Sequence, residues 1–110
     1  WKLMVSFIMK MKAKPEKLLE LKQTLQALIE PTRKAKGCLS HDVFQDIEND
    51  NNICLFEKWE SQADLGDHLR SDRFTVLMGT KILLNQPPCI TMSEASSSSG
   101  WEAVEAVRNT

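Results

Sequence analysis

Several residue types are scarce in this chain of 110 residues, and each scarcity excludes a class of protein. The four glycines are scattered, so none forms the glycine-rich loop that cradles phosphates in nucleotide-binding proteins. The three cysteines include no CxxC pair and are odd in number, which favours small buried side chains in a reducing cytoplasm. The formal net charge of −1 provides no overall field that attracts nucleic acid or an anionic membrane.

Long apolar runs and metal-binding motifs are also missing. No apolar stretch approaches the ~18 residues of a membrane-spanning helix, and the N-terminus lacks the apolar core and cleavage site of a signal peptide. The two histidines, His41 and His68, show no HxH or HxxxH spacing, so we expect no metal site. The composition, 42% apolar and 26% charged, is that of one small globular domain, which we expect in the cytoplasm.

The N-terminal part of the chain predicts a strand followed by a long helix. Alternation over residues 1–13 gives one strongly apolar face, formed by Trp1, Leu3, Val5, Phe7, Met9 and Met11. Pro15 fits the first turn of a helix whose leucines recur at helical spacing. We expect Pro31 to interrupt this helix and Gly37 to adopt the left-handed conformation after its last turn.

The middle of the chain predicts a hairpin and two helical segments. Residues 38–46 and 52–60 have the composition of β-strands, and the polar residues 47–51 between them are of the types that favour a turn. Ser61 is a good N-cap for the first helix, and Ser71 or Asp72 can cap the second. The second helix is expected to carry the apolar residues Phe74, Leu77, Met78 and Ile82.

A short strand over residues 89–94 completes a β-α-β-β-α-β order, which predicts an α+β, ferredoxin-like fold with a four-stranded antiparallel sheet. Helices cover one face of such a sheet, so its other face is open. Apolar residues are nevertheless expected on the open face, namely Met4, Ile8, Cys54 and Phe56. An exposed apolar sheet face favours a homodimer that packs sheet against sheet.

The C-terminal region differs in composition from the rest of the chain. Residues 96–100 (SSSSG) have the character of a flexible linker, and the apolar residues Trp101, Val104 and Val107 follow at helical spacing. We therefore divide the chain into a domain over residues 1–94 and a Ser-rich linker and tail over residues 95–110.

A candidate site emerges from the register of the hairpin. With the turn at 46–52, Val43 lies opposite Leu55, His41 opposite Glu57 and Leu39 opposite Trp59. A histidine beside a carboxylate is a usable base, and Trp59 offers a flat apolar wall to an aromatic ligand. The helix that starts at Ser61 folds back over the sheet, so His68 can approach the same region.

Each of these residues also has a purely structural interpretation. His41 and Glu57 can simply satisfy each other near a strand end, and Trp59 can be an ordinary core residue. His68 can reach water between Leu65 and Leu69.

Five short motifs, in order, resemble the antibiotic biosynthesis monooxygenase (quinol monooxygenase-like) family of the dimeric α/β barrel superfamily. They are Lys14 and Pro15, Glu30 to Arg33, Gly37 to Ser40, Phe56 to Ser61, and His68 and Leu69 followed by Ser71 and Phe74. The resemblance implies a homodimer whose two sheets form a barrel, and a pocket between sheet and helices in each subunit. It also implies oxidation of an aromatic substrate by dioxygen without a cofactor.

The resemblance supports Trp59 and His68, which occupy positions where related proteins place pocket residues, whereas His41 and Glu57 are candidates from the hairpin register alone. His68, His41 and Glu57 are expected to be catalytic, by handling the proton of the substrate. Trp59, Leu65 and Phe74 are expected to bind a small aromatic substrate.

The chain also departs from its family at several positions. It has no tyrosine, His41 stands where many relatives have an aromatic residue, and Arg73 replaces a frequent second histidine. Haem-degrading relatives have a histidine at the position of Met78 and an asparagine near Ile8, so haem degradation is disfavoured.

The leading hypothesis is a cofactor-independent monooxygenase that oxidises an aromatic quinol or polycyclic phenol with dioxygen. One alternative is an isomerase of a small hydroxy-carbonyl signalling compound, which shuttles protons but consumes no oxygen. Another is a non-catalytic module that binds a small ligand. A fold alone does not decide among these.

Overall fold

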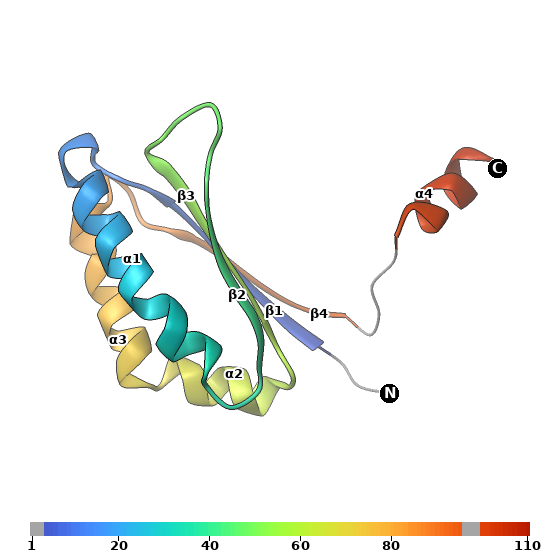
Figure 1. Ribbon diagram of the computed structural model, residues 1–110, viewed down its shortest axis with the longest axis horizontal. Coiled ribbons are helices and arrows are strands. Elements are labelled where there is room, and N and C mark those ends of the chain that lie inside the picture. The colour runs from blue at the N-terminus through green and yellow to red at the C-terminus, as the bar shows by residue number, and fades with distance from the viewer. Residues whose placement is uncertain (1–3, 96–99) are drawn as a thin grey trace.

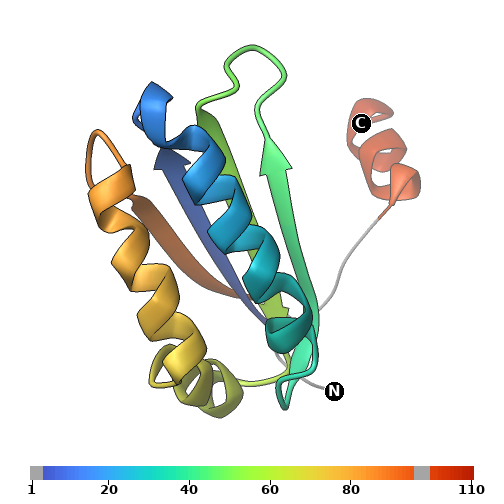
Figure 2. The same ribbon diagram turned by 60° about the vertical axis from the view of Figure 1, so that its left-hand side comes forward.

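The computed structural model describes residues 4–95 and 100–110, and it confirms the predicted ferredoxin-like α+β fold. The sheet is antiparallel with strand order β2-β3-β1-β4, and helices α1, α2 and α3 lie on one of its faces (Figures 1 and 2). The elements are β1 (Met4–Lys12), the 3-10 turn η1 (Pro15–Lys17), α1 (Leu18–Arg33), β2 (Cys38–Gln45), β3 (Asn52–Trp59), α2 (Gln62–Leu69), α3 (Asp72–Gly79), the 3-10 turn η2 (Thr80–Leu83), β4 (Cys89–Ala95) and α4 (Trp101–Arg108).

β1 is a central strand, and its alternating sequence decides which residues enter the core. Successive side chains of a strand point to opposite faces, and the face with Val5, Phe7, Met9 and Met11 is buried beneath the helices, as predicted. Trp1 and Leu3, expected on the same face, lie outside the described residues.

The long helix α1 and the turn after it agree with the sequence-based prediction, except for the residue at which the helix ends. Leu21 and Leu25 are buried at helical spacing against the sheet. The expected interruption at Pro31 is wrong: α1 continues to Arg33, because Pro31 lies in the last turn, where it removes only one backbone donor. Gly37 has a φ of 80°, the left-handed conformation predicted for it.

The hairpin of β2 and β3 confirms most of the predicted register. Val43 pairs with Leu55 and His41 pairs with Glu57. The predicted pairing of Leu39 with Trp59 is wrong, since a β-bulge between Cys38 and Ser40 places Cys38 opposite Trp59. The bulge inserts one extra residue into β2, so Leu39 turns outward and is 49% exposed.

The two helices after β3 begin at the predicted caps. The Ser61 side chain accepts a hydrogen bond from the backbone N–H of Asp64, and Ser71 does the same for Phe74. Of the apolar residues expected on the second of these helices, Leu77 is buried, whereas Met78 is 47% and Ile82 75% exposed. Ile82 lies in η2, whose tighter turn replaces the continuous helix that the sequence predicted and changes the angular spacing of side chains, whereas Met78 lies within α3, next to the buried Leu77.

The sheet face opposite the helices is open and partly apolar, as predicted (Figure 1). Ile8 pairs with Phe56 at its centre, and both are only half-buried, as are Met4 and Cys54.

The tail contains the predicted short helix α4, of which no residue is buried. The predicted linker residues 96–99 lie outside the described part of the chain. Within the described ranges, no helix is both long and apolar enough to cross a membrane.

Candidate active site

The candidate site centres on Glu57, a carboxylate in the core of β3 that is 1% exposed. One oxygen, Oε2, lies 2.8 Å from Nδ1 of His41. The other, Oε1, accepts a hydrogen bond of 2.9 Å from the indole Nε1–H of Trp59. Nε2 of His68 lies 3.5 Å from the same Oε1, which is too far for a well-formed hydrogen bond. The structure therefore brings together the four residues that the sequence singled out.

Local structure explains how these side chains meet. His41 and Glu57 are directly paired across β2 and β3, and Trp59 is two residues beyond Glu57 on the same face. His68 comes from α2, which starts at the Ser61 cap immediately after β3 and returns over the sheet. His68 is buried, so it does not reach water.

Aromatic rings enclose the helix side of the cluster. The rings of Trp59 and His68 stack with centroids 4.5 Å apart and an interplanar angle of 27°. Phe74 meets His68 edge to face at 5.6 Å, and it meets Phe7 in the same way at 5.9 Å. Trp59 is fully buried, so an aromatic ligand reaches its face only if the surrounding rings move.

The electrostatics of Glu57 follow from its partners. Burial alone raises the pKa of this carboxyl group, because an apolar surrounding disfavours the charged form. The interactions of Glu57 with His41, His68 and Trp59 outweigh burial and lower the pKa of Glu57 to about 2. Glu57 is therefore a carboxylate at neutral pH, and it orients the imidazoles rather than donating a proton.

Cys38, which lies opposite Trp59, belongs to the surroundings of this site. Burial raises the pKa of the Cys38 thiol, and the negative charge of Glu57 raises it further. A raised pKa keeps the thiol protonated, so Cys38 is a poor nucleophile.

Two arginines at this site had no role in the sequence-based prediction. Arg33 donates a hydrogen bond of 3.0 Å from Nε to the backbone carbonyl of His41, which ties α1 to β2. Arg73 lies with Nη2 3.5 Å from Nδ1 of His68, and its buried Nε has no partner among the described residues. The only sequence signal for Arg73 was that it replaces a histidine frequent in the family.

The expected substrate-binding residues do not all line one cavity. Leu65 lines a hollow of about 300 Å3 between α2 and β4, together with Val5, Gln62, Met92, Ser93 and Glu94. The Gln62 side-chain amide contacts the Glu94 carboxylate across this hollow. Because Val5 pairs directly with Trp59, the hollow lies next to the buried cluster.

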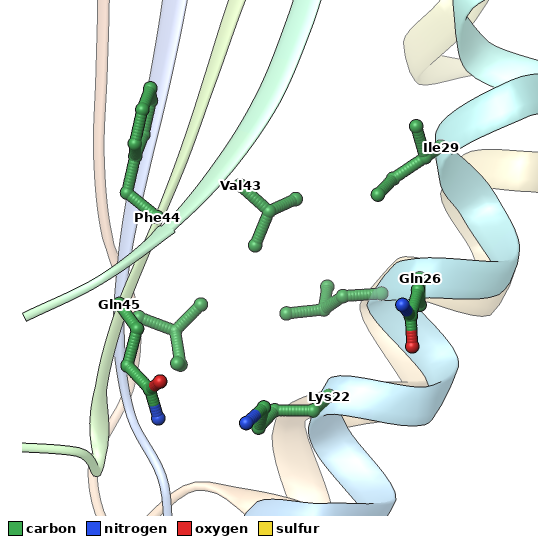
Figure 3. A pocket seen from close by; sticks show the side chains of 8 residues that line it. Lys22, Gln26, Ile29, Val43, Phe44 and Gln45 are labelled. Atoms are coloured by element: carbon green, nitrogen blue, oxygen red, sulfur yellow. The ribbon is translucent and has the colours of Figure 1, made fainter.

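A second cavity, of about 260 Å3, lies between α1 and the hairpin. Figure 3 shows Val43 of β2 and Ile29 of α1 facing each other across it, with Lys22 and Gln26 on the helix. It contains none of the predicted site residues. Over the described ranges, no group of three His, Cys, Asp or Glu side chains is arranged to hold a metal ion.

The fold and the buried acid–histidine cluster define a small ferredoxin-like domain, and comparison with known proteins identifies its family. The family model described as antibiotic biosynthesis monooxygenase matches residues 4–79, which is more than half of the chain. The chain belongs to the antibiotic biosynthesis monooxygenase family, as the sequence motifs predicted.

Individual relatives are also similar to this chain. The candidate monooxygenase YcnE of Bacillus subtilis is 29% identical over 86 residues, which cover 77% of this chain and 90% of YcnE. The Synechocystis protein sll1783 is 36% identical over 63 residues, which cover 57% of this chain and only 43% of that protein.

Solved structures show the same fold. Rv0793 from Mycobacterium tuberculosis superimposes with a TM-score of 0.81 at 26% identity, covering 88% of this chain and 99% of that one. A conserved protein from Methanosarcina mazei Go1 gives a TM-score of 0.79 at 30% identity, covering 84% and 92%.

Proposed function

We propose that this protein is a cofactor-independent monooxygenase that oxidises an aromatic quinol or polycyclic phenol with dioxygen. Membership of the family and the relative named as a candidate monooxygenase support the reaction class. The observation that carries the proposal is the buried Glu57 carboxylate with an imidazole on each side. Such a cluster can take the proton that turns a phenol into an electron-rich anion.

The reaction that we propose balances without a cofactor. Removal of the hydroxyl proton gives an anion that passes electrons to dioxygen and forms a C–O bond at a ring carbon. That carbon then loses its one hydrogen as the O–O bond breaks, which leaves a carbonyl group. The second oxygen atom leaves as water, whose two hydrogens are this hydrogen and the hydroxyl proton. The protein contributes a base, a fixed orientation and exclusion of bulk water.

His68, His41 and Glu57 are the catalytic residues in this proposal, and Trp59, Leu65 and Phe74 bind the substrate. The hollow beside Leu65 is the route by which an aromatic ring approaches Trp59. Entry requires the Gln62 contact with Glu94 to open, because this contact spans the hollow. The fully buried rings of Trp59 and His68 then move apart to admit the substrate.

We also propose a homodimer that packs the open sheet faces together, acting in the cytoplasm. The half-buried apolar residues Ile8 and Phe56 at the centre of this face support the assembly, since a patch of this kind marks an interaction site.

Oxygen uptake tests the proposed activity. A panel of naphthoquinols and polycyclic phenols is incubated with the protein while an oxygen electrode records consumption, and isotopically labelled dioxygen identifies the atom incorporated. We expect turnover to fall by about 10²-fold or more in His41→Ala or His68→Ala. The control Lys22→Ala, in the cavity of Figure 3, should keep wild-type turnover.

Other results of these experiments would contradict the proposed roles or indicate one of the two alternative functions, an isomerase or a binding module. Unchanged turnover in both histidine variants contradicts the proposed roles. Conversion of a hydroxy-carbonyl compound without oxygen consumption indicates an isomerase. A bound ligand in native mass spectrometry, without conversion of any compound, indicates a binding module.

A further inference from the structure

The surroundings of His68 differ from those of His41, although both imidazoles flank the same carboxylate. Nδ1 of His68 lies 3.5 Å from the Arg73 guanidinium, and its Nε2 lies 3.5 Å from Glu57 Oε1. One ring nitrogen thus faces a cation and the other faces an anion. The ring itself is held between Trp59 and Phe74.

The chemistry of the two flanking groups decides where the proton of His68 lies. A guanidinium is always protonated and only donates, so the nitrogen that faces Arg73 must offer a lone pair. A neutral imidazole carries one proton, which must then be on Nε2, towards the Glu57 carboxylate. A second proton on Nδ1 would point a donor and a positive charge at Arg73.

His41 has the opposite arrangement. Its Nδ1 lies 2.8 Å from Glu57 Oε2, and an ionised carboxylate only accepts, so Nδ1 carries the proton. The lone pair of neutral His41 is then on Nε2, which is buried and has no partner among the described residues. Arg33 binds the backbone carbonyl of His41 rather than its ring, so no cation blocks this nitrogen.

We propose that Arg73 is a positioning residue that holds His68 neutral with its proton on Nε2, leaving Nε2 of His41 as the atom that accepts the proton of the substrate. The tautomer of His68 follows from the geometry alone, whereas the role of His41 rests on the proposed function. In this arrangement Glu57 orients His41 and stabilises the imidazolium that forms there. His68 supports Glu57 as a fixed donor.

Nitrogen-15 NMR of the imidazoles tests the tautomers without any substrate. At mildly alkaline pH we expect wild-type His68 with its proton on Nε2 and His41 with its proton on Nδ1. Arg73→Met should give His68 a mixture of tautomers, and Arg73→Lys should restore most of the Nε2 form. Arg70→Met, which removes an exposed arginine that pairs with Asp67, should leave His68 unchanged.

The wild-type spectrum is decisive even if a variant fails to fold. His68 that carries its proton on Nδ1, or on both nitrogens, overturns the role of Arg73. A spectrum of His68 that is identical in wild type and folded Arg73→Met also overturns it.

Kinetics then test His41, once a substrate is known. We expect His41→Gln to lower kcat by about 10²-fold or more, because glutamine cannot take a proton. His68→Gln, which keeps an N–H donor near Glu57, should lower kcat less than His41→Gln does. The reverse order of effects overturns the assignment of the base. Failure to find oxygen uptake refutes the proposed function but leaves the NMR result on Arg73 intact.

Discussion

At the scale of single residues, Glu57 explains why a small core holds two imidazoles. A buried carboxylate is unfavourable unless donors surround it, and Glu57 is hydrogen-bonded to His41 and Trp59, with Nε2 of His68 3.5 Å away. The position of these donors fixes the charge of Glu57, and Glu57 in turn fixes the orientation of the rings. The cluster is therefore one cooperative unit, and a change in any member should affect the others.

The stability of the protein should depend on pH through Glu57. The pKa of this carboxyl group is about 2 in the folded protein against an ordinary value of 4.5. As pH falls, the unfolded chain takes up this proton first, so the contribution is fully present above about pH 4.5 and is lost between 4.5 and 2. The two values correspond to a contribution of about 3 kcal/mol.

Glu57→Gln should remove this dependence, because glutamine does not titrate. Urea unfolding at several pH values should show a variant that is about 3 kcal/mol less stable at neutral pH and loses less stability than wild type on acidification. Glu20→Gln, on the exposed surface of α1, is the matched control and should follow wild type. Equal slopes for Glu57→Gln and wild type below pH 4.5 would refute the assignment.

Part of this cluster was predictable from sequence, for a physical reason. The two-residue period of a hairpin fixes which side chains share a face, so the pairing of His41 with Glu57 followed from the position of the turn. Arg73 was not predictable, since its place near His68 depends on the angle between α2 and α3. That angle is set by packing of whole helices and leaves no local pattern in the sequence.

At the scale of elements, the turn between α1 and β2 holds the hairpin in position. Gly37 adopts a φ of 80° there, and its carbonyl accepts a hydrogen bond of 2.8 Å from the N–H of Glu60 at the end of β3. The β-bulge follows at once, between Cys38 and Ser40. The glycine was predictable as a helix stop, but the bulge was not, because an extra residue in one strand leaves the alternation of its partner unchanged.

Gly37→Ala should therefore destabilise the domain, by about 2 kcal/mol or more. The left-handed conformation costs an alanine about 1–2 kcal/mol, and the added Cβ would lie 2.3 Å from Cγ of Asp64. Gly79→Ala is the matched control, because a Cβ at the end of α3 meets nothing within 4 Å. Thermal unfolding should show Gly79→Ala equal to or slightly more stable than wild type. Similar losses in both variants would contradict this account of the turn.

At the scale of the whole molecule, the two faces of the sheet have different roles. One face packs against the helices (Figure 2). The buried acid–histidine cluster lies on this face. The opposite face carries Ile8 and Phe56 beside Lys10 and Lys58, without a covering element in Figure 1. A second copy that covers this face would remove its apolar centre from water while the lysines remain at its edge.

A lysine at the centre of the open face should therefore separate the proposed dimer. Ile8→Lys places a charge where two apolar faces would meet, and an unpaired buried charge is strongly unfavourable. Sedimentation at micromolar concentration should show wild type as a dimer and Ile8→Lys as a monomer. The matched control is Ile47→Lys in the hairpin turn, where the side chain is 98% exposed, and this variant should remain dimeric. The variants should share the circular dichroism of wild type, because neither side chain belongs to the helix-covered core. A wild-type protein that sediments as a monomer, or an Ile8→Lys variant that stays dimeric, would show that the open face is not the interface.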